Sequence, residues 1–215
     1  MTETAETATD GGLADLADRF DQDRAMATLT ALCAEDLAGR GLGSPGHDLA
    51  SRWLVAHLTS IGLDPRSDTF EVPEVFRLAE APSVTVDGGP LAGELEHRRD
   101  YAEHPRSARM DAPAAGTAVR WDGTPVAGAW AVLERVPQGT AFVELVDQVR
   151  AAGGVGLLTP QDPDGSGFLT KRTVGAGVVQ LPVVAVRSDL LKQLAGSTVT
   201  AYVPLVRAAA TGAYP

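Results

Sequence analysis

The sequence has 215 residues, a formal net charge of −10, 44% hydrophobic residues and 21% charged residues. This balance is typical of a globular protein and excludes an intrinsically disordered chain. The negative charge argues against binding to nucleic acid or to an anionic membrane surface. No apolar run approaches the roughly 20 residues that a membrane-spanning helix needs.

The amino-terminal segment reads MTETAETATDGG and lacks the basic and apolar regions of a signal peptide. We expect residues 1–12 to form a disordered tail. Cys33 is the only cysteine, which excludes an intrachain disulfide and a cysteine-rich zinc site. These features predict a cytoplasmic protein in which Cys33 is buried as a small apolar side chain.

Two helices are predicted next. Apolar residues at helical spacing indicate a helix over 13–38, broken near 21–23, and four glycines and a proline then make 38–46 a loop. The second helix begins at Ser44 or Pro45, because serine caps helices and proline suits the first turn. It ends at Gly62.

The second helix carries one apolar stripe. Its members are Leu49, Trp53, Leu54, Leu58 and Ile61. A helix this short is marginal without tertiary packing. We therefore predict that Trp53 is buried, either against the chain from Phe70 onward or in a subunit interface.

The middle of the chain gives weaker patterns. Short strands are predicted at Phe70–Val72 and at Ser83–Val86, the latter followed by a turn. Residues 94–109 are polar and are expected to be irregular and solvated. The small residues 112–116 indicate a loop.

From residue 128 onward the pattern is clear. It predicts strands at 129–136, 155–159, 178–186 and 198–206, helices at 142–152 and 188–195, and a Gly/Asp-rich loop at 160–176. Pro182 places its strand at an edge or a bulge, and Ser188 or Asp189 is expected to cap the last helix. The fold class is therefore α/β or α+β, with a mixed sheet or open barrel and flanking helices.

Candidate chemistry is sparse. The richest group of metal-ligand residue types is Glu94, Glu96, His97, Asp100, Glu103 and His104. It has no apolar frame to hold an ion, so we expect neither a metal nor another cofactor. Ser166 lies outside any nucleophile motif. Arg40 could help the following helix terminus to hold an anion, or its loop could be a tight connection between helices.

Several segments resemble a known family. Residues 36–47, DLAGRGLGSPGH, and the Gly62-Leu63-Asp64-Pro65 turn resemble the opening of the di-zinc aminopeptidases, relatives of glutamate carboxypeptidase and the transferrin receptor. Residues 128–133, 151–158 and 181–186 resemble the protease-associated domain of that family. The resemblance covers roughly residues 27–207.

The resemblance implies a helical segment over 13–69 and a protease-associated-like domain over 70–215. It also implies that the zinc ligands and the catalytic acid would follow residue 215, so none of them has a counterpart here. We expect the chain by itself to bind no zinc and to lack peptidase activity.

Three functions stay open. The first is a non-catalytic binding module, derived from a zinc aminopeptidase that has lost its catalytic domain, which meets a protein partner or a second copy through its first helices. The second is a small-molecule-binding protein or biosynthetic enzyme, and the third is half of a split metallopeptidase. The candidate binding residues are Arg40, His47, Trp53 and Trp121. A pocket could combine Trp53, Phe76 and Trp121 with His47, Asp100 or His104 as acid–base groups.

Overall fold

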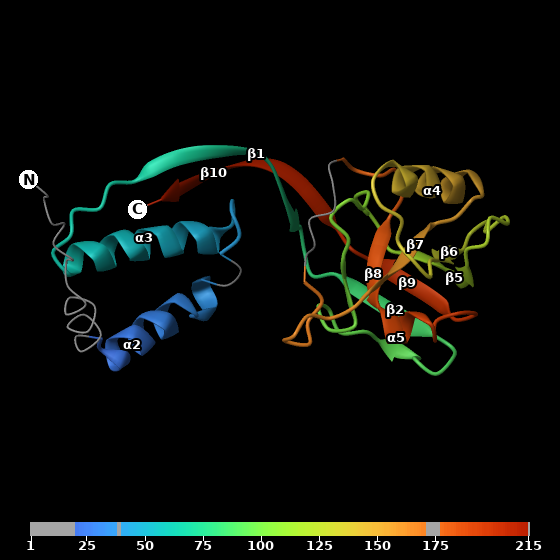
Figure 1. The fold of residues 1–215 in the computed structure, drawn as a ribbon, viewed down its shortest axis with the longest axis horizontal. Coiled ribbons are helices and arrows are strands. Elements are labelled where there is room, and N and C mark those ends of the chain that lie inside the picture. Colours follow the sequence, from blue (N-terminus) through green and yellow to red (C-terminus); the bar gives the residue numbers. More distant parts are fainter. Residues whose placement is uncertain (1–19, 38–39, 171–176, 215) are drawn as a thin grey trace, which may run out of the picture. The chain divides into compact units, whose positions relative to one another are not determined.

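The computed structural model describes residues 20–37, 40–170 and 177–214, which fall into two compact units (Figure 1). We call the residues up to Val75 together with those from Ala209 the helical unit, and Phe76–Ala208 the sheet unit. The predicted tail, 1–12, lies outside the described residues, and the predicted division at residue 69 stays a prediction. In the part of the chain that is described, no helix has the length and apolar character needed to cross a membrane.

The helical unit begins with α2 (Gln22–Leu32) and a short 3-10 helix, η1 (Glu35–Leu37). Asp21 caps α2 by accepting a hydrogen bond from the Arg24 backbone N–H at 2.9 Å. The carboxylate suits this position because the first amides of a helix lack intrahelical partners. This cap explains why α2 begins at Gln22, while the helix predicted before it, over residues 13–19, lies outside the described range.

Helix α3 (Pro45–Ser60) matches its prediction closely. The Ser44 hydroxyl accepts from the His47 backbone N–H at 3.3 Å, and Pro45 occupies the first turn. Gly62 follows the helix with a φ of +87°, a conformation that glycine adopts without the steric cost other residues meet. Both helix limits are confirmed.

One burial prediction for the helical unit is wrong, and another is contradicted in one of its two alternatives. Cys33 is exposed rather than buried, because it follows the last turn of α2, a helix without a buried residue. Trp53 is only half-buried in this chain, since the buried residues of α3 are just Gly46 and Ala50. The interface alternative for Trp53 stays a prediction.

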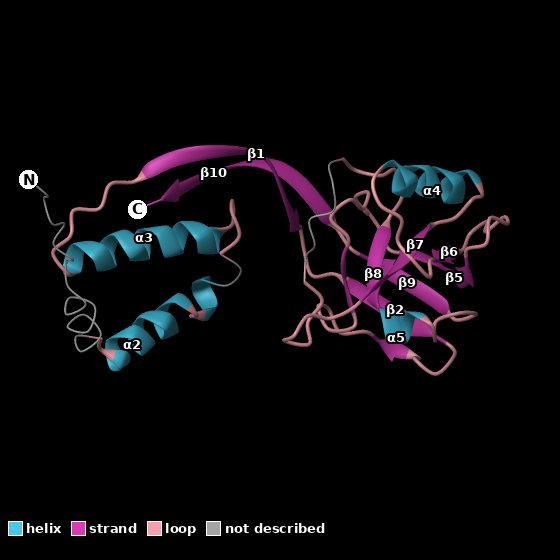
Figure 2. Ribbon diagram, in the orientation of Figure 1, coloured by secondary structure: helices cyan, strands magenta, loops and turns pink. Residues whose placement is uncertain are grey.

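A two-stranded sheet joins distant parts of the sequence (Figure 2). It pairs β1 (Asp68–Leu78) with β10 (Leu205–Tyr214). Both strands are longer than predicted, and residues 198–206 form parts of two strands rather than one. Gly212 is required in β10, because a Cβ there would lie 2.3 Å from the Phe70 ring and 2.6 Å from Leu42.

The sheet unit is a curled mixed sheet of eight strands in the order β3-β2-β9-β5-β6-β7-β8-β4. Strands β5 to β8 are mutually parallel, and the remaining pairs are antiparallel. The bounds are β2 (Ser83–Asp87), β3 (Gly93–Glu94), β4 (Tyr101–Glu103), β5 (Ala114–Arg120), β6 (Trp130–Val132), β7 (Gly156–Gln161), β8 (Val183–Arg187) and β9 (Thr198–Tyr202). The predicted fold class is confirmed.

Each face of this sheet has its own apolar core. Along β6, Trp130 and Val132 belong to one core, whereas Ala131 belongs to the other. This alternation follows from the two-residue period of a strand. Helix α4 (Thr140–Ala151) covers the second core with Phe142, Val146 and Val149, whereas Leu190 and Leu191 of α5 (Ser188–Leu191) join the first.

The structure corrects four predictions in the sheet unit. Residues 112–116 include the start of strand β5 rather than forming a loop, because β9 and β6 pair on either side of it. The polar stretch 94–109 is buried over 101–104 and at Arg106 and Ser107, and it contributes to β3 and β4. Pro182 precedes β8, an inner strand, so it marks no edge. Helix α5 ends at Leu191, and no side chain in the described ranges caps its start.

Candidate functional site

The main candidate site is a groove at the carboxyl ends of the parallel strands. It has a volume of about 630 Å³ and is lined by residues that end or follow β5, β6 and β7 and by residues of α5. In open α/β sheets, ligands bind outside the carboxyl ends of the strands because loops and helix starts converge there. The topology of the sheet unit therefore positions this groove.

The groove combines an apolar floor with charges of both signs. Val132, Leu133 and Leu191 are each at most 8% exposed and form part of the floor. The ionic side chains in the lining are Arg120, Glu134, Asp162 and Lys192. Arg120 and Glu134 form an ion pair at 3.0 Å with both side chains about two-thirds exposed (68% and 69%), so solvent screens the pair and it contributes little to stability.

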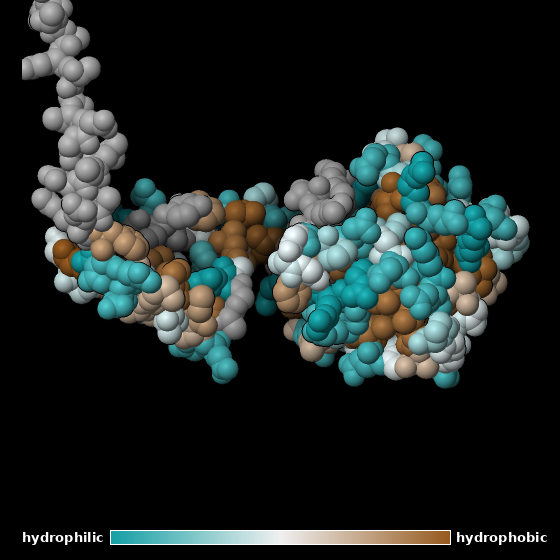
Figure 3. All heavy atoms as spheres, turned by 60° about the horizontal axis from the view of Figure 1, so that its bottom comes forward, coloured by the Kyte–Doolittle hydropathy of each residue, from teal (hydrophilic) through white to brown (hydrophobic). Residues whose placement is uncertain are grey.

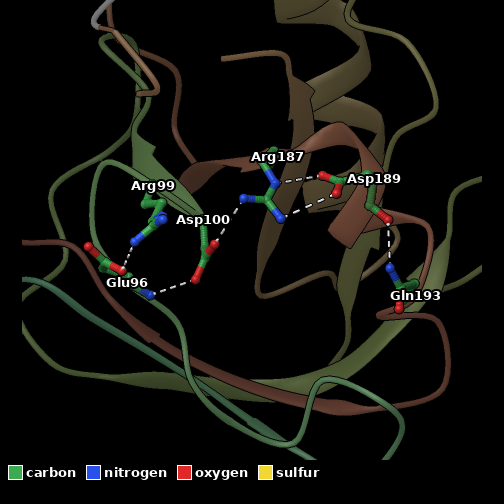
Figure 4. Close-up of polar contacts among 6 residues, drawn as sticks. All are labelled: Glu96, Arg99, Asp100, Arg187, Asp189 and Gln193. Atoms are coloured by element: carbon green, nitrogen blue, oxygen red, sulfur yellow. Dashed lines mark hydrogen bonds and ion pairs between the residues drawn. The ribbon is translucent and has the colours of Figure 1, made fainter. Parts of the chain in front are cut away.

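A polar network fixes the start of α5 beside the groove (Figure 4). The Arg187 guanidinium donates to both carboxylate oxygens of Asp189, at 2.7 and 3.2 Å, and lies 3.4 Å from Asp100. The hydrogen bond between Arg187 and Asp189 raises the pKa of Arg187 and lowers that of Asp189. A bidentate pair of this kind orders both side chains.

The same network holds the loop before β4. Asp100 accepts a hydrogen bond from the Glu96 backbone N–H at 3.0 Å, and its carbonyl oxygen accepts one from the Arg187 N–H at 2.8 Å. Gln193 donates to the Asp189 carbonyl oxygen at 3.1 Å. Asp100 was expected to be an acid–base group. In the structure its hydrogen bonds instead hold the backbone at Glu96 and Arg187 in place.

A second polar cluster surrounds a buried acid. Glu103 is 2% exposed and lies 2.8 Å from His97 Nε2. The neighbouring Tyr101 is also buried, and burial, with the charges of Glu94 and Glu103 adding to it, raises its pKa to about 12. The stretch from Glu94 to His104 was expected to be solvated, but Tyr101 and Glu103 within it are buried. Within the described ranges, no three His, Cys, Asp or Glu side chains gather closely enough to hold a metal ion.

His104 lies apart from these groups, against Phe142 of α4, with 5.2 Å between the ring centroids. It is 8% exposed. Burial, and secondarily the charge of Arg106, lowers the pKa of His104 to about 4, because an imidazolium would lose its hydration there. The ring is therefore neutral at pH 7.

The other expected site residues have separate surroundings. Arg40 donates to the Leu32 carbonyl oxygen at 2.5 Å, at the end of α2. His47 is half-buried in the first turn of α3, and its buried Nε2 has no hydrogen-bond partner among the described residues. Trp53 stacks on His57 with centroids 4.9 Å apart. Trp121 packs against the core under α4, and Phe76 belongs to β1.

None of the residues that line the groove was predicted from the sequence as a site residue. Arg120 follows small residues that indicate a loop, so its strand could not be recognised. Glu134 and Asp162 could have been predicted from the sequence, because polar residues that directly follow buried strands of one parallel sheet meet at its carboxyl edge. That signal requires knowing that the strands are parallel.

No family model matches this chain, and no curated protein sequence matches it either. Solved structures do. A peptidase M28 precursor from Shewanella amazonensis superposes with a TM-score of 0.52 at 18% identity over 83% of this chain and 47% of that one. A zinc aminopeptidase from Bacillus subtilis gives 0.51 at 14% identity, over 85% and 44%. An aminopeptidase from Aneurinibacillus gives 0.48 at 18% identity, over 91% and 47%.

The likeness establishes the fold. The chain shares its fold with a part of these peptidase and aminopeptidase structures, which supports the protease-associated-like fragment that the resemblance in the sequence implies. It spans about half the length of the solved chains that it matches, 44–47%. At 14–18% identity, activity does not transfer with the fold.

Proposed function

We propose that this chain is a non-catalytic binding module of the zinc-aminopeptidase type, and that the groove of the sheet unit binds a short peptide segment. The groove itself carries the proposal. Its volume of about 630 Å³ falls in the range of roughly 300–1,000 Å³ typical of ligand sites. The choice of peptide as ligand rests on the chemistry of the lining and on the likeness in fold to a peptidase and an aminopeptidase.

The lining suits a peptide because it offers both charges around an apolar floor. Arg120 and Lys192 can bind a carboxylate or main-chain carbonyl groups, whereas Glu134 and Asp162 can bind an ammonium group. The exposed Arg120–Glu134 pair can exchange its partners for those of a ligand at little cost, since such pairs contribute about 1 kcal/mol or less.

The non-catalytic part of the proposal rests on the composition of the groove. The described residues that line it include neither histidine nor cysteine. Histidine is the commonest general base, and cysteine is a strong nucleophile. The full chain should therefore not hydrolyse leucine p-nitroanilide with added zinc or cobalt. Turnover that copurifies with the chain and disappears in His97→Ala would contradict a purely binding role.

Binding is tested by blocking the groove. Ala195 is exposed and lies in its lining, so Ala195→Trp should obstruct it. The matched control is Ala151→Trp, at an exposed position at the end of α4. We expect saturation-transfer NMR to show the tetrapeptide Leu-Lys-Ala-Glu bound to the wild type and to the control, with at least a tenfold weaker response for Ala195→Trp. Equal responses would contradict the proposal.

A second candidate function is docking through the helical unit. A groove of about 660 Å³ there is lined by Val55 and Ala56 of α3 together with Thr69 and Gly212. Ile61 and Leu63, just beyond α3, are 53% and 55% exposed. Apolar side chains reach the surface of this unit (Figure 3), and this supports docking, because exposed apolar patches are common at protein–protein interfaces.

This candidate is tested by the assembly state. If the helical unit pairs with a second copy, the wild type should be a dimer by light scattering, and Ile61→Glu should be a monomer. Thr59→Glu, at an exposed position two residues earlier, on α3, is the control for added charge. A monomeric wild type would remove the second copy as the partner.

A further inference from the structure

A small cavity lies at the start of α4, and the chain lines it with hydrogen-bond donors. Its volume is about 130 Å³, and its lining includes His104, Arg106, Gly139 and Phe142. A single water needs about 10–15 Å³ on this measure. The cavity can thus hold a ligand of several heavy atoms but not a peptide, and its residues are not those of the groove.

Arg106 brings a buried positive charge to this cavity. The residue is 8% exposed, and its guanidinium lies 5.2 Å from the centre of the Phe142 ring. Nε donates to the Gly177 carbonyl oxygen at 3.1 Å. In the described parts of the chain, neither Nη group has a hydrogen-bond partner, and no carboxylate pairs with the side chain. Arginine cannot lose its charge in a protein, so this buried cation lacks a counter-ion.

His104 adds a second buried donor. Its Nδ1 accepts a hydrogen bond from the Arg106 backbone N–H at 3.3 Å. That contact assigns the ring proton to Nε2. Nε2 therefore donates, and no described group accepts from it. At 8% exposed, this side chain also lies in the lining of the cavity.

Helix α4 supplies further donors. Its N-cap position is Gly139, which has no side chain to accept a hydrogen bond from the first turn. The backbone N–H of Phe142, which an N-cap side chain normally satisfies, is left for another acceptor. The positive end of the helix dipole also favours an anion here.

We propose that this cavity binds a small oxyanion, a carboxylate or a phosphate, through the Arg106 Nη groups, His104 Nε2 and the start of α4. A planar guanidinium matches either oxyanion with two parallel hydrogen bonds. A bound anion would give Arg106 the counter-ion that the protein does not provide. Gln138 and Val136, which also line the cavity, carry no negative charge to compete with it.

The test is anion-dependent stabilisation of the full chain at constant ionic strength. Sodium acetate, phosphate or sulfate replaces sodium chloride, and the melting temperature is followed with concentration, since a ligand of the folded state raises it. We expect at least one oxyanion to raise the melting temperature of the wild type. Acetate alone would identify a carboxylate ligand, and phosphate with sulfate would identify a tetrahedral one.

Variants assign the effect to the cavity. Arg106→Gln should weaken the apparent affinity at least tenfold, and His104→Phe should weaken it less. Arg109→Gln is the matched control, because Arg109 is exposed and pairs with Asp111 instead. A wild type that responds to oxyanions no more than to chloride, or an unchanged affinity in Arg106→Gln, would overturn the proposal.

A direct measurement covers the case in which the variants do not fold. Side-chain nitrogen NMR of the wild type should show shifts of the Arg106 guanidinium and of His104 Nε2 when phosphate or acetate is added. The guanidinium of Arg109, which is exposed and lies outside both the cavity and the groove, is the internal reference. Shifts confined to surface arginines would overturn the proposal. That result would leave the proposed peptide binding at the groove untouched, because the two sites share no lining residue.

Discussion

The sheet unit and the helical unit differ in how completely they bury their apolar side chains. In the sheet unit, Trp130, Val146 and Leu157 are fully buried, at 0% exposed. In the helical unit, α2 has no buried residue, and Met26 and Leu29 are 53% and 55% exposed. Burial of apolar surface is the main source of folding free energy. The sheet unit therefore provides its own core, whereas the helical unit is stabilised far less by its own contacts.

The largest expected effect tests the core of the sheet unit. Trp130 lies against Gly156, where a Cβ would approach the indole to 2.1 Å. Trp130→Ala should lower the free energy of unfolding by about 3–5 kcal/mol, the usual cost of removing a large aromatic side chain from a core. Urea unfolding followed by circular dichroism measures it. A loss below about 1 kcal/mol would show that this core is not close-packed.

The second effect is pH-dependent and also belongs to the sheet unit. The pKa of His104 is about 4 in the folded chain, against 6.5 for an imidazole exposed to water, so between these pH values the unfolded state binds more protons. Stability is then fully present above pH 6.5 and falls by roughly 3 kcal/mol as the pH drops toward 4.

His104→Gln isolates that effect. The variant keeps a neutral side chain with a donor at every pH, so its stability should lack this slope between pH 6.5 and 4. Urea unfolding in chloride buffers, without oxyanions, gives both curves. Parallel curves for the wild type and the variant would mean that His104 titrates normally.

A smaller loss is expected in the helical unit. Trp53 is half-buried and stacks on His57. Trp53→Ala should cost about 1–2 kcal/mol, roughly half the value for a core aromatic. Hydrogen exchange over α3 measures it locally. A loss as large as that of Trp130→Ala would show that Trp53 is covered in solution, for example by a second copy.

The smallest effect concerns Cys33. Because the thiol is exposed, Ellman's reagent should modify it fully in the native protein, without prior unfolding. The modification should leave the melting temperature of the sheet unit unchanged. A thiol that reacts only in urea would mean that this end of α2 is protected in solution.

Sequence reasoning succeeded where local rules decide the structure. Ser44, Pro45 and Gly62 mark the limits of α3 through capping and backbone preference. The strand, helix and strand at 130–161 follow from apolar periodicity and short turns. These rules act between residues close in the chain, so the sequence displays them.

Sequence reasoning failed where distant residues decide the structure. Strand β5 is held by its pairing with β9 and β6, not by the strand preference of Ala114, Ala115 and Gly116. The burial of Glu103 depends on partners such as His97, and that of Arg106 on Phe142. The groove combines residues from 120 to 195, so it emerges only once the parallel order of the strands is known.

The central claim is that the sheet unit carries a ligand site at the carboxyl ends of its parallel strands. Backbone-amide chemical shifts of the full chain, recorded while Leu-Lys-Ala-Glu is added, test it most directly. The account predicts saturable shifts concentrated at Leu133, Glu134, Asp162, Ser188 and Lys192, with none in α2 or α3. Shifts confined to the helical unit, or none at any residue, would contradict it.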